Sequence, residues 1–150
     1  MKRPFWSLFI ICSIGISSHA QANADAIIGK WMSADDNLLV EVFKTGNEYR
    51  AKLVWFDDSD DKSNPVNQRL DKKNPDMTLR ARKLVGIEVL WNLHYNPSDD
   101  EWQDGTIYDS SSGKKWDAKA WINTTGILKV RGYWNFPIFG KNMSFKKVKQ

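Results

Sequence analysis

Side chains that could act as acids, bases or nucleophiles are scarce in this chain. The single cysteine, Cys12, and one of the two histidines, His19, lie in the first 20 residues, which are typical of a leader segment. The other histidine, His94, stands on the polar side of a strand-like alternation, which predicts an exposed ring. A cysteine nucleophile and an all-histidine zinc site are therefore excluded from the rest of the chain. We expect no catalytic residue and no cofactor, so an enzyme is the least supported of three functional hypotheses.

The acidic run from Asp57 to Asp61 has the composition of a calcium-binding loop. When Asp57 is taken as the first position of such a loop, Lys62 stands where glycine is needed and Gln68 where the bidentate glutamate is needed. Both departures remove features on which calcium binding depends. We therefore expect a solvated loop and no metal.

The elements that position any site are predicted to be strands. Apolar residues recur with a period of two in several segments, which is typical of strands with one buried and one exposed face. The segments that we expect to be strands are Ile27–Met32, Leu38–Phe43, Tyr49–Phe56, Ile87–Tyr95, Lys115–Ile122, Leu128–Trp134 and Met143–Val148, within a total of eight or nine. No amphipathic helix lies between these segments. Parallel strands need crossover connections, usually helices, so the sequence argues against a parallel sheet. The sequence predicts an all-β fold, an antiparallel up-and-down β-barrel, with a β-sandwich as the alternative.

Large aromatic residues fall on the predicted inward faces of these strands. In the segment Ile87–Tyr95 the alternation places Val89, Trp91 and Leu93 inside, together with both end residues. The candidates for the wall of a ligand cavity are Trp55, Trp91, Tyr95, Trp116 and Trp134. Large rings beside small residues such as Ala118 produce either a filled core or a cavity. We expect a binder of a small hydrophobic or amphipathic ligand, and the alternative is a structural or protein-interaction barrel with a filled core and no ligand.

The segment Asp71 to Arg82, DKKNPDMTLRAR, has neither a strand's alternation nor a helix's periodicity. Asn74 is suited to cap a short helical turn near residues 74–80, with Pro75 at its first position and Asp76 at the positive end of its dipole.

This segment is predicted to be a lid or plug over one mouth of the barrel. We expect Met77 and Leu79 to face the barrel. We expect Arg80 and Arg82 to bond with Asp71, with Asp76 or with a backbone carbonyl, and these two arginines are also candidates for ligand contact.

The N-terminal residues are typical of a secretory signal peptide. A basic start, Met1 to Arg3, precedes the apolar run Phe5–Ile16, which is too short to span a bilayer. Small residues allow cleavage that leaves Gln21, Asn23 or Asp25 as the first residue. We expect Asp25, which gives a signal peptide over 1–24 and a single domain over 25–150. Export to the periplasm or the extracellular space follows, with no transmembrane segment after cleavage.

Charge argues against a nucleic-acid partner. Removal of Lys2 and Arg3 leaves 20 of the 22 basic residues against 18 acidic residues, a net charge of +2 with histidine neutral. No basic cluster large enough to cover a nucleic-acid backbone remains. We expect a monomer that binds no nucleic acid and at most a small hydrophobic ligand.

Several spaced motifs together resemble the DUF2147 family of secreted bacterial proteins. The residues that carry the resemblance are Gly29, Trp31, Asp71, Asn74, Pro75, Gly105, Tyr108, Asp109, Gly113, Arg131 and Gly132. The resemblance covers the whole expected domain and implies a lipocalin-like, calycin-type barrel in the periplasm or facing the outer membrane, with no established activity. Where the family tends to end in a Trp-x-Arg strand, this chain has Phe145-Lys146-Lys147. Lys147 can still lie over the Trp31 indole, which would contribute about 0.5 to 1 kcal/mol.

Overall fold

The computed structural model describes residues 23–134 and 140–149, so that residues 1–22, which hold most of the expected signal peptide, lie outside the described residues. These described residues form eight strands: β1 (Gly29–Ser33), β2 (Leu38–Thr45), β3 (Glu48–Phe56), β4 (Glu88–Asn96), β5 (Glu101–Asp109), β6 (Lys114–Ile122), β7 (Leu128–Tyr133) and β8 (Gly140–Lys147). Three short 3-10 helices accompany them: η1 (Asp25–Ile27), η2 (Val66–Gln68) and η3 (Met77–Leu79).

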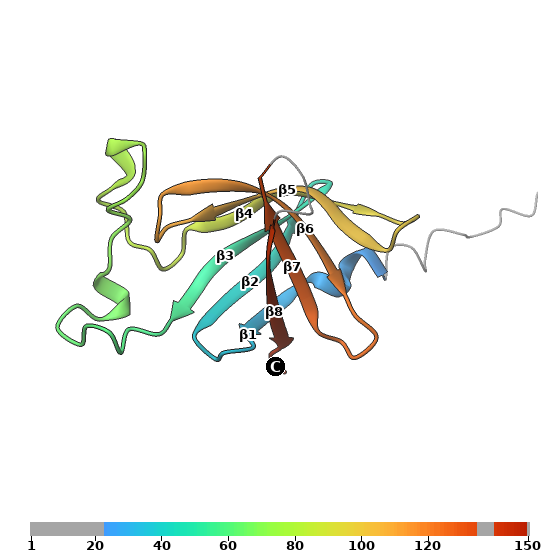
Figure 1. Cartoon of the computed structure of the whole chain (residues 1–150), viewed down its shortest axis with the longest axis horizontal. Coiled ribbons are helices and arrows are strands. Elements are labelled where there is room, and N and C mark those ends of the chain that lie inside the picture. The colour runs from blue at the N-terminus through green and yellow to red at the C-terminus, as the bar shows by residue number, and fades with distance from the viewer. Residues whose placement is uncertain (1–22, 135–139, 150) are drawn as a thin grey trace, which may run out of the picture.

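The strands close into a barrel (Figure 1). Each strand pairs antiparallel with the next, and β1 pairs with β8 through three residue pairs, Trp31 with Lys147, Met32 with Lys146 and Ser33 with Phe145. Closure satisfies the hydrogen-bonding edges that an open meander would expose. The predicted up-and-down barrel is thus confirmed, and the β-sandwich alternative is wrong.

The up-and-down order gives the barrel two different ends. At one end lie η1 and the turns that join β2 to β3, β4 to β5 and β6 to β7; we call it the η1 end. At the other end lie the β5–β6 turn and the long β3–β4 loop, residues 57–87, and we call it the loop end. In Figure 1 the β3–β4 loop, drawn in green, stands to the side of the barrel.

Aromatic rings fill the η1 end. Trp31, Tyr49 and Trp102 are almost completely buried there. Trp31 Nε1 donates to the carbonyl of Ile27 at 2.7 Å, and Trp102 Nε1 donates to the carbonyl of Ala24 at 3.1 Å. Buried indole N–H groups need such partners. The segment that leads into β1 therefore closes this end and satisfies the polar atoms of the rings beneath it.

The C-terminal strand adds a cation to this end. Lys147 Nζ lies 5.2 Å from the centroid of the Trp31 ring and donates to the carbonyl of Ala26 at 2.9 Å. Gly29 has φ of 127°, and a Cβ there would lie 3.3 Å from Cε of Lys147. The predicted contact of Lys147 with the Trp31 indole is confirmed.

The inward face of β4 differs from the predicted alternation. Leu90 and Leu93 are the buried residues of this strand, at 6% and 0% exposure, and Asn92 between them has φ of 57°. A bulge adds one residue and reverses the alternation. Trp91 pairs with Thr106, which pairs with exposed Asp117, so Trp91 lies on the outer face. The prediction that Trp91 points into the barrel is wrong.

Candidate functional site

A buried carboxylate organises the base of the β3–β4 loop. Asp71 is fully buried and accepts hydrogen bonds from the Tyr108 hydroxyl at 2.5 Å and from Asn74 Nδ2 at 2.8 Å. Arg82 donates to Asp71 Oδ2 from Nε at 3.0 Å, and its Nη2 forms an ion pair with the same oxygen at 2.8 Å. A buried carboxylate is tolerated only when it has such partners. Tyr108 belongs to β5, so this cluster ties the loop to the barrel wall.

The protonation of both acidic groups in the cluster is set by the same contacts. Burial acts to raise the pKa of Asp71, but the hydrogen bonds from Tyr108, Asn74 and Arg82, together with the arginine charge, outweigh burial and lower that pKa. Burial and the neighbouring Asp71 carboxylate raise the pKa of Tyr108 to about 12. Asp71 is therefore ionised and Tyr108 is a neutral donor near neutral pH.

Backbone contacts fix the loop further. The Asp71 amide donates to the carbonyl of Arg82 at 3.0 Å, which joins the two ends of the polar segment. Lys73 Nζ donates to the carbonyl of Ser111, in the β5–β6 turn, at 2.6 Å. A Cβ at Gly113 would lie only 2.0 Å from the carbonyl oxygen of Lys73, and Gly113 has φ of 74°. Only glycine permits this approach of the turn to the loop.

The helical turn predicted in the segment is present as η3, with a different cap. Asp76 is the N-cap residue and accepts from the amide of Thr78 at 2.9 Å, whereas Asn74 Oδ1 accepts from the amide of Asp76 at 2.9 Å. Asn74 lies two residues before this cap, and its side-chain amide donates to Asp71. The prediction of Asn74 as the N-cap is wrong, since Asp76 takes that role.

The two apolar residues of η3 have different surroundings. Met77 is 75% exposed, so the prediction that it faces the barrel is wrong, whereas Leu79, 37% exposed, lines a pocket beside the outer face of the barrel. The arginine partners are as predicted: Arg82 bonds to Asp71, and Arg80 Nε donates to the carbonyl of Asn74 at 2.7 Å. The polar contacts orient the segment, and its apolar side chains are left at the surface.

A pocket of about 610 Å³ lies between this segment and the outer face of β4. It is lined by Asn74, Pro75, Asp76, Leu79, Arg82, Gly86, Ile87, Glu88, Trp91, Tyr108 and Lys115. Trp91 is half-buried, and Lys115 Nζ lies 5.5 Å from the centroid of its ring. The pocket thus combines an indole and aliphatic side chains with four charged groups.

The structure does not gather the predicted wall residues around one site. Trp91 and Arg82 line the pocket, whereas Arg80 is exposed outside its lining. Trp116 lies near the loop end with its ring centroid 5.8 Å from that of Trp134, which is 59% exposed.

The remaining two predicted residues belong to other surroundings. Trp55 is half-buried in β3 and pairs with Leu39 of β2. Tyr95 packs against Trp102, with ring centroids 5.2 Å apart, and its hydroxyl donates to Asp100 at 2.5 Å. Burial and this carboxylate raise the pKa of Tyr95 to about 12.

Two residues of interest were absent from the predicted wall, namely Trp102 in the core and Lys115 at the pocket. Trp102 is followed by Asp104, whose φ of 62° marks a bulge, so the alternation that would have shown its inward face is broken. Lys115 stands on the polar face of its strand, which sequence alone cannot distinguish from an ordinary solvated face. Its proximity to Trp91 depends on the pairing of β4, β5 and β6.

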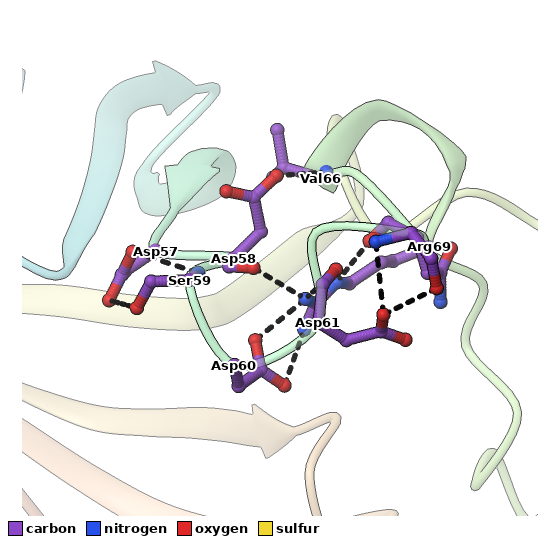
Figure 2. Close-up of polar contacts among 9 residues, drawn as sticks. Asp57, Asp58, Ser59, Asp60, Asp61, Val66 and Arg69 are labelled. Atoms are coloured by element: carbon purple, nitrogen blue, oxygen red, sulfur yellow. Dashed lines mark hydrogen bonds and ion pairs between the residues drawn. The ribbon is translucent and has the colours of Figure 1, made fainter.

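The acidic run of the loop has an internal cation (Figure 2). Arg69 Nη2 lies 2.6 Å from Asp60 Oδ1 and also donates to the carbonyl of Asp58 at 3.1 Å. Asp58 Oδ2 accepts from the amide of Val66 at 2.7 Å. A guanidinium therefore lies among the oxygens that a calcium loop would direct to the ion. Within residues 23–134 and 140–149, no group of three or more His, Cys, Asp or Glu side chains is placed to hold a metal ion.

Comparisons with known proteins agree with the fold. The family described as "Uncharacterized protein conserved in bacteria (DUF2147)" matches residues 29–147. Among solved structures, the chain is similar to protein HP1028 from the human pathogen Helicobacter pylori, described as belonging to the lipocalin family, with a TM-score of 0.69 and 20% identity over 82% of this chain and 83% of that one. No curated protein sequence matches significantly. The helices in the described part of the chain are all too short or too polar to span a membrane.

Proposed function

The chain belongs to the DUF2147 family, and on the basis of its lipocalin-like barrel and the pocket beside Trp91 we propose that it binds a small hydrophobic or amphipathic molecule. The pocket carries this proposal. Its volume of about 610 Å³ falls within the range of small-molecule sites, about 300 to 1,000 Å³. Its lining combines a half-buried indole and aliphatic groups with a few polar groups, which is the usual make-up of such sites.

The ligand would lie against the outside of the barrel rather than in its interior. Trp31, Tyr49 and Trp102 occupy the η1 end of the barrel. The outer face of β4 presents Trp91, and the β3–β4 loop provides Pro75 and Leu79 opposite it. Because the Asp71 cluster fixes the loop to Tyr108, the pocket is formed before a ligand arrives, which lowers the entropic cost of binding.

Replacing Trp91 with alanine tests the proposal. In the wild type we expect the tryptophan fluorescence to change when fatty acids, isoprenoids or aromatic dyes are titrated. For a compound that binds, Trp91→Ala should raise the dissociation constant about tenfold, because an aromatic contact contributes about 1 kcal/mol or more beyond its buried area.

Trp121→Ala is the matched control for this experiment. Trp121 is also half-buried and also has a lysine over its ring, with Lys119 Nζ at 5.3 Å, but it does not line the pocket. Its removal should leave binding unchanged. Silent titrations across the whole panel, together with native mass spectrometry that finds no co-purifying mass, would exclude the proposal and favour a barrel with a purely structural role.

We also propose that the chain is exported to the periplasm or the extracellular space and is monomeric. The charged start and apolar run of residues 1–16 support export. Ala24 is 7% exposed and accepts the Trp102 hydrogen bond, which favours a mature chain that begins at Gln21 or Asn23 and keeps Ala24 over the expected start at Asp25. The intact mass of protein from a periplasmic fraction should match one of these starts and a single copy; an uncleaved mass in the cytoplasm would contradict export.

A further inference from the structure

The pocket contains four charged side chains, and three of them are already engaged. The four are Asp76, Arg82, Glu88 and Lys115. Arg82 forms the ion pair with Asp71, and Glu88 Oε2 lies 3.1 Å from Arg50 Nη1. Asp76 Oδ1 accepts from both the amide and the hydroxyl of Thr78, at 2.9 and 2.7 Å. These three groups therefore have neighbours that stabilise their charges.

Lys115 differs from them. Among residues 23–134 and 140–149 it forms no ion pair and no hydrogen bond. Its ammonium group makes a cation–π contact with the Trp91 ring. The side chain is exposed on β6 and lines the pocket. The charge that the pocket offers to a ligand is thus the positive charge of an ammonium group that lies beside the indole.

A second donor lies in the same pocket. Arg82 uses Nε and Nη2 to hold Asp71, while its Nη1 makes no hydrogen bond within the part of the chain that the structure describes. Asp71 neutralises the guanidinium charge but does not occupy this amino group. Arg82 can therefore donate a directional hydrogen bond to an acidic oxygen of a ligand. The ammonium group of Lys115 would supply the counter-charge for that acidic group.

We infer that the ligand of this pocket is an amphipathic anion, whose acidic head group is bound by Lys115 and assisted by Arg82 while its apolar part packs against Trp91. This inference rests on the proposed binding function and adds the class of ligand. A cationic ligand is disfavoured because Lys115 already lies over the ring that would attract it. A neutral ligand would bury the same apolar surface but would leave the ammonium without a counter-charge.

Two fluorescent dyes with the same aromatic core test the charge of the ligand. Anilinonaphthalene sulfonate is an anion, and phenylnaphthylamine is its neutral counterpart without the sulfonate. We expect the full chain to bind the sulfonate about fivefold more tightly than the neutral dye, which corresponds to about 1 kcal/mol for one partly exposed ion pair. This preference should shrink in high salt because the ion pair is screened.

Substitutions of Lys115 assign the preference to this residue. Lys115→Met keeps an apolar stem over Trp91 and removes the charge, so it should weaken binding of the sulfonate more than binding of the neutral dye and thereby abolish the preference. Lys115→Arg should restore the preference. Lys114→Met is the matched control, because Lys114 is an exposed lysine next in the chain that does not line the pocket; it should leave both affinities unchanged.

The outcomes separate the two proposals. If both dyes bind and Trp91→Ala weakens both, but Lys115→Met leaves their ratio unchanged, the anion inference is overturned and the binding function stands. If the wild type shows no preference for the sulfonate, the anion inference is likewise overturned. If Trp91→Ala changes neither affinity, both proposals fail. If neither dye binds, the anion inference is overturned, and the binding function falls with it when the wider panel and native mass spectrometry are also silent.

Discussion

Replacing Trp102 with alanine should lower the free energy of unfolding by about 4 kcal/mol, because it removes a fully buried aromatic side chain and leaves a cavity. Trp102 is 2% exposed and contacts Tyr49 and Tyr95, with ring centroids 6.4 and 5.2 Å away. The buried carbonyl of Ala24 also loses the Trp102 indole N–H as its donor. Urea unfolding followed by circular dichroism measures the loss.

Two further variants serve as comparisons for the size of this stability loss. Trp102→Phe keeps a ring in the core and removes the hydrogen bond to Ala24, so it should cost less than alanine does, about 1 to 2 kcal/mol. Trp134→Ala removes the same side chain from a site that is 59% exposed, and it should cost at most about 1 kcal/mol. Equal losses for Trp102→Ala and Trp134→Ala would contradict the packing of the η1 end.

Asp71→Ala should lower the free energy of unfolding by about 3 kcal/mol, since loss of one partner of a buried ion pair leaves its donors unsatisfied. Tyr108, Asn74 and Arg82 would all lose the acceptor that joins the β3–β4 loop to the barrel. The Arg82 side chain is 35% exposed and can turn to water, which keeps the estimate at the lower end of the range.

Asp60→Ala is the control for this variant. Asp60 also pairs with an arginine of the same loop, Arg69, but its side chain is 68% exposed. Water screens an exposed pair, so Asp60→Ala should change stability far less than Asp71→Ala does. Similar stability losses in the two variants, measured by urea unfolding, would show that the buried cluster does not hold the loop.

The dependence of stability on pH provides a second measurement of the same cluster. The folded state lowers the pKa of Asp71 below its ordinary value of 3.8, so the stability that it supplies is complete above 3.8 and is lost as the pH falls through the lower folded pKa. Between about pH 5 and about pH 2 the urea midpoint should therefore decrease, and Asp71→Asn should remove part of this decrease. An identical slope in wild type and variant would contradict the lowered pKa.

The barrel could be predicted from the sequence because its signals are local. Alternating residues in segments such as Lys115–Ile122 give the strands, and the lack of an amphipathic helix gives antiparallel order. Arg82 and Asp71 could be paired because they stand in one short polar segment and a buried carboxylate needs a cation. These features depend on neighbouring residues or on charge, both of which can be read along the chain.

The site could not be predicted in full because bulges and distant contacts decide it. Asn92 and Asp104 adopt positive φ, although neither is glycine. At both positions the alternation shifts, so the neighbouring side chains point to the other side of the sheet than a regular strand would place them. Trp91 therefore lies outside the barrel where alternation predicts inside. The partner of the Trp102 indole is Ala24, which lies before the first strand and can be identified only once the barrel has closed.

The short seam between β1 and β8 is the pairing on which closure of the barrel depends. All other strand pairs join strands that are neighbours in the chain. Ser33 and Phe145 of the seam belong to the first and last strands of the barrel, so bringing them together closes a long loop, at an entropic cost that grows with loop length. As long as this seam is unpaired, the other strand pairs form a curved sheet with two unpaired edges, and pairing of β1 with β8 removes both.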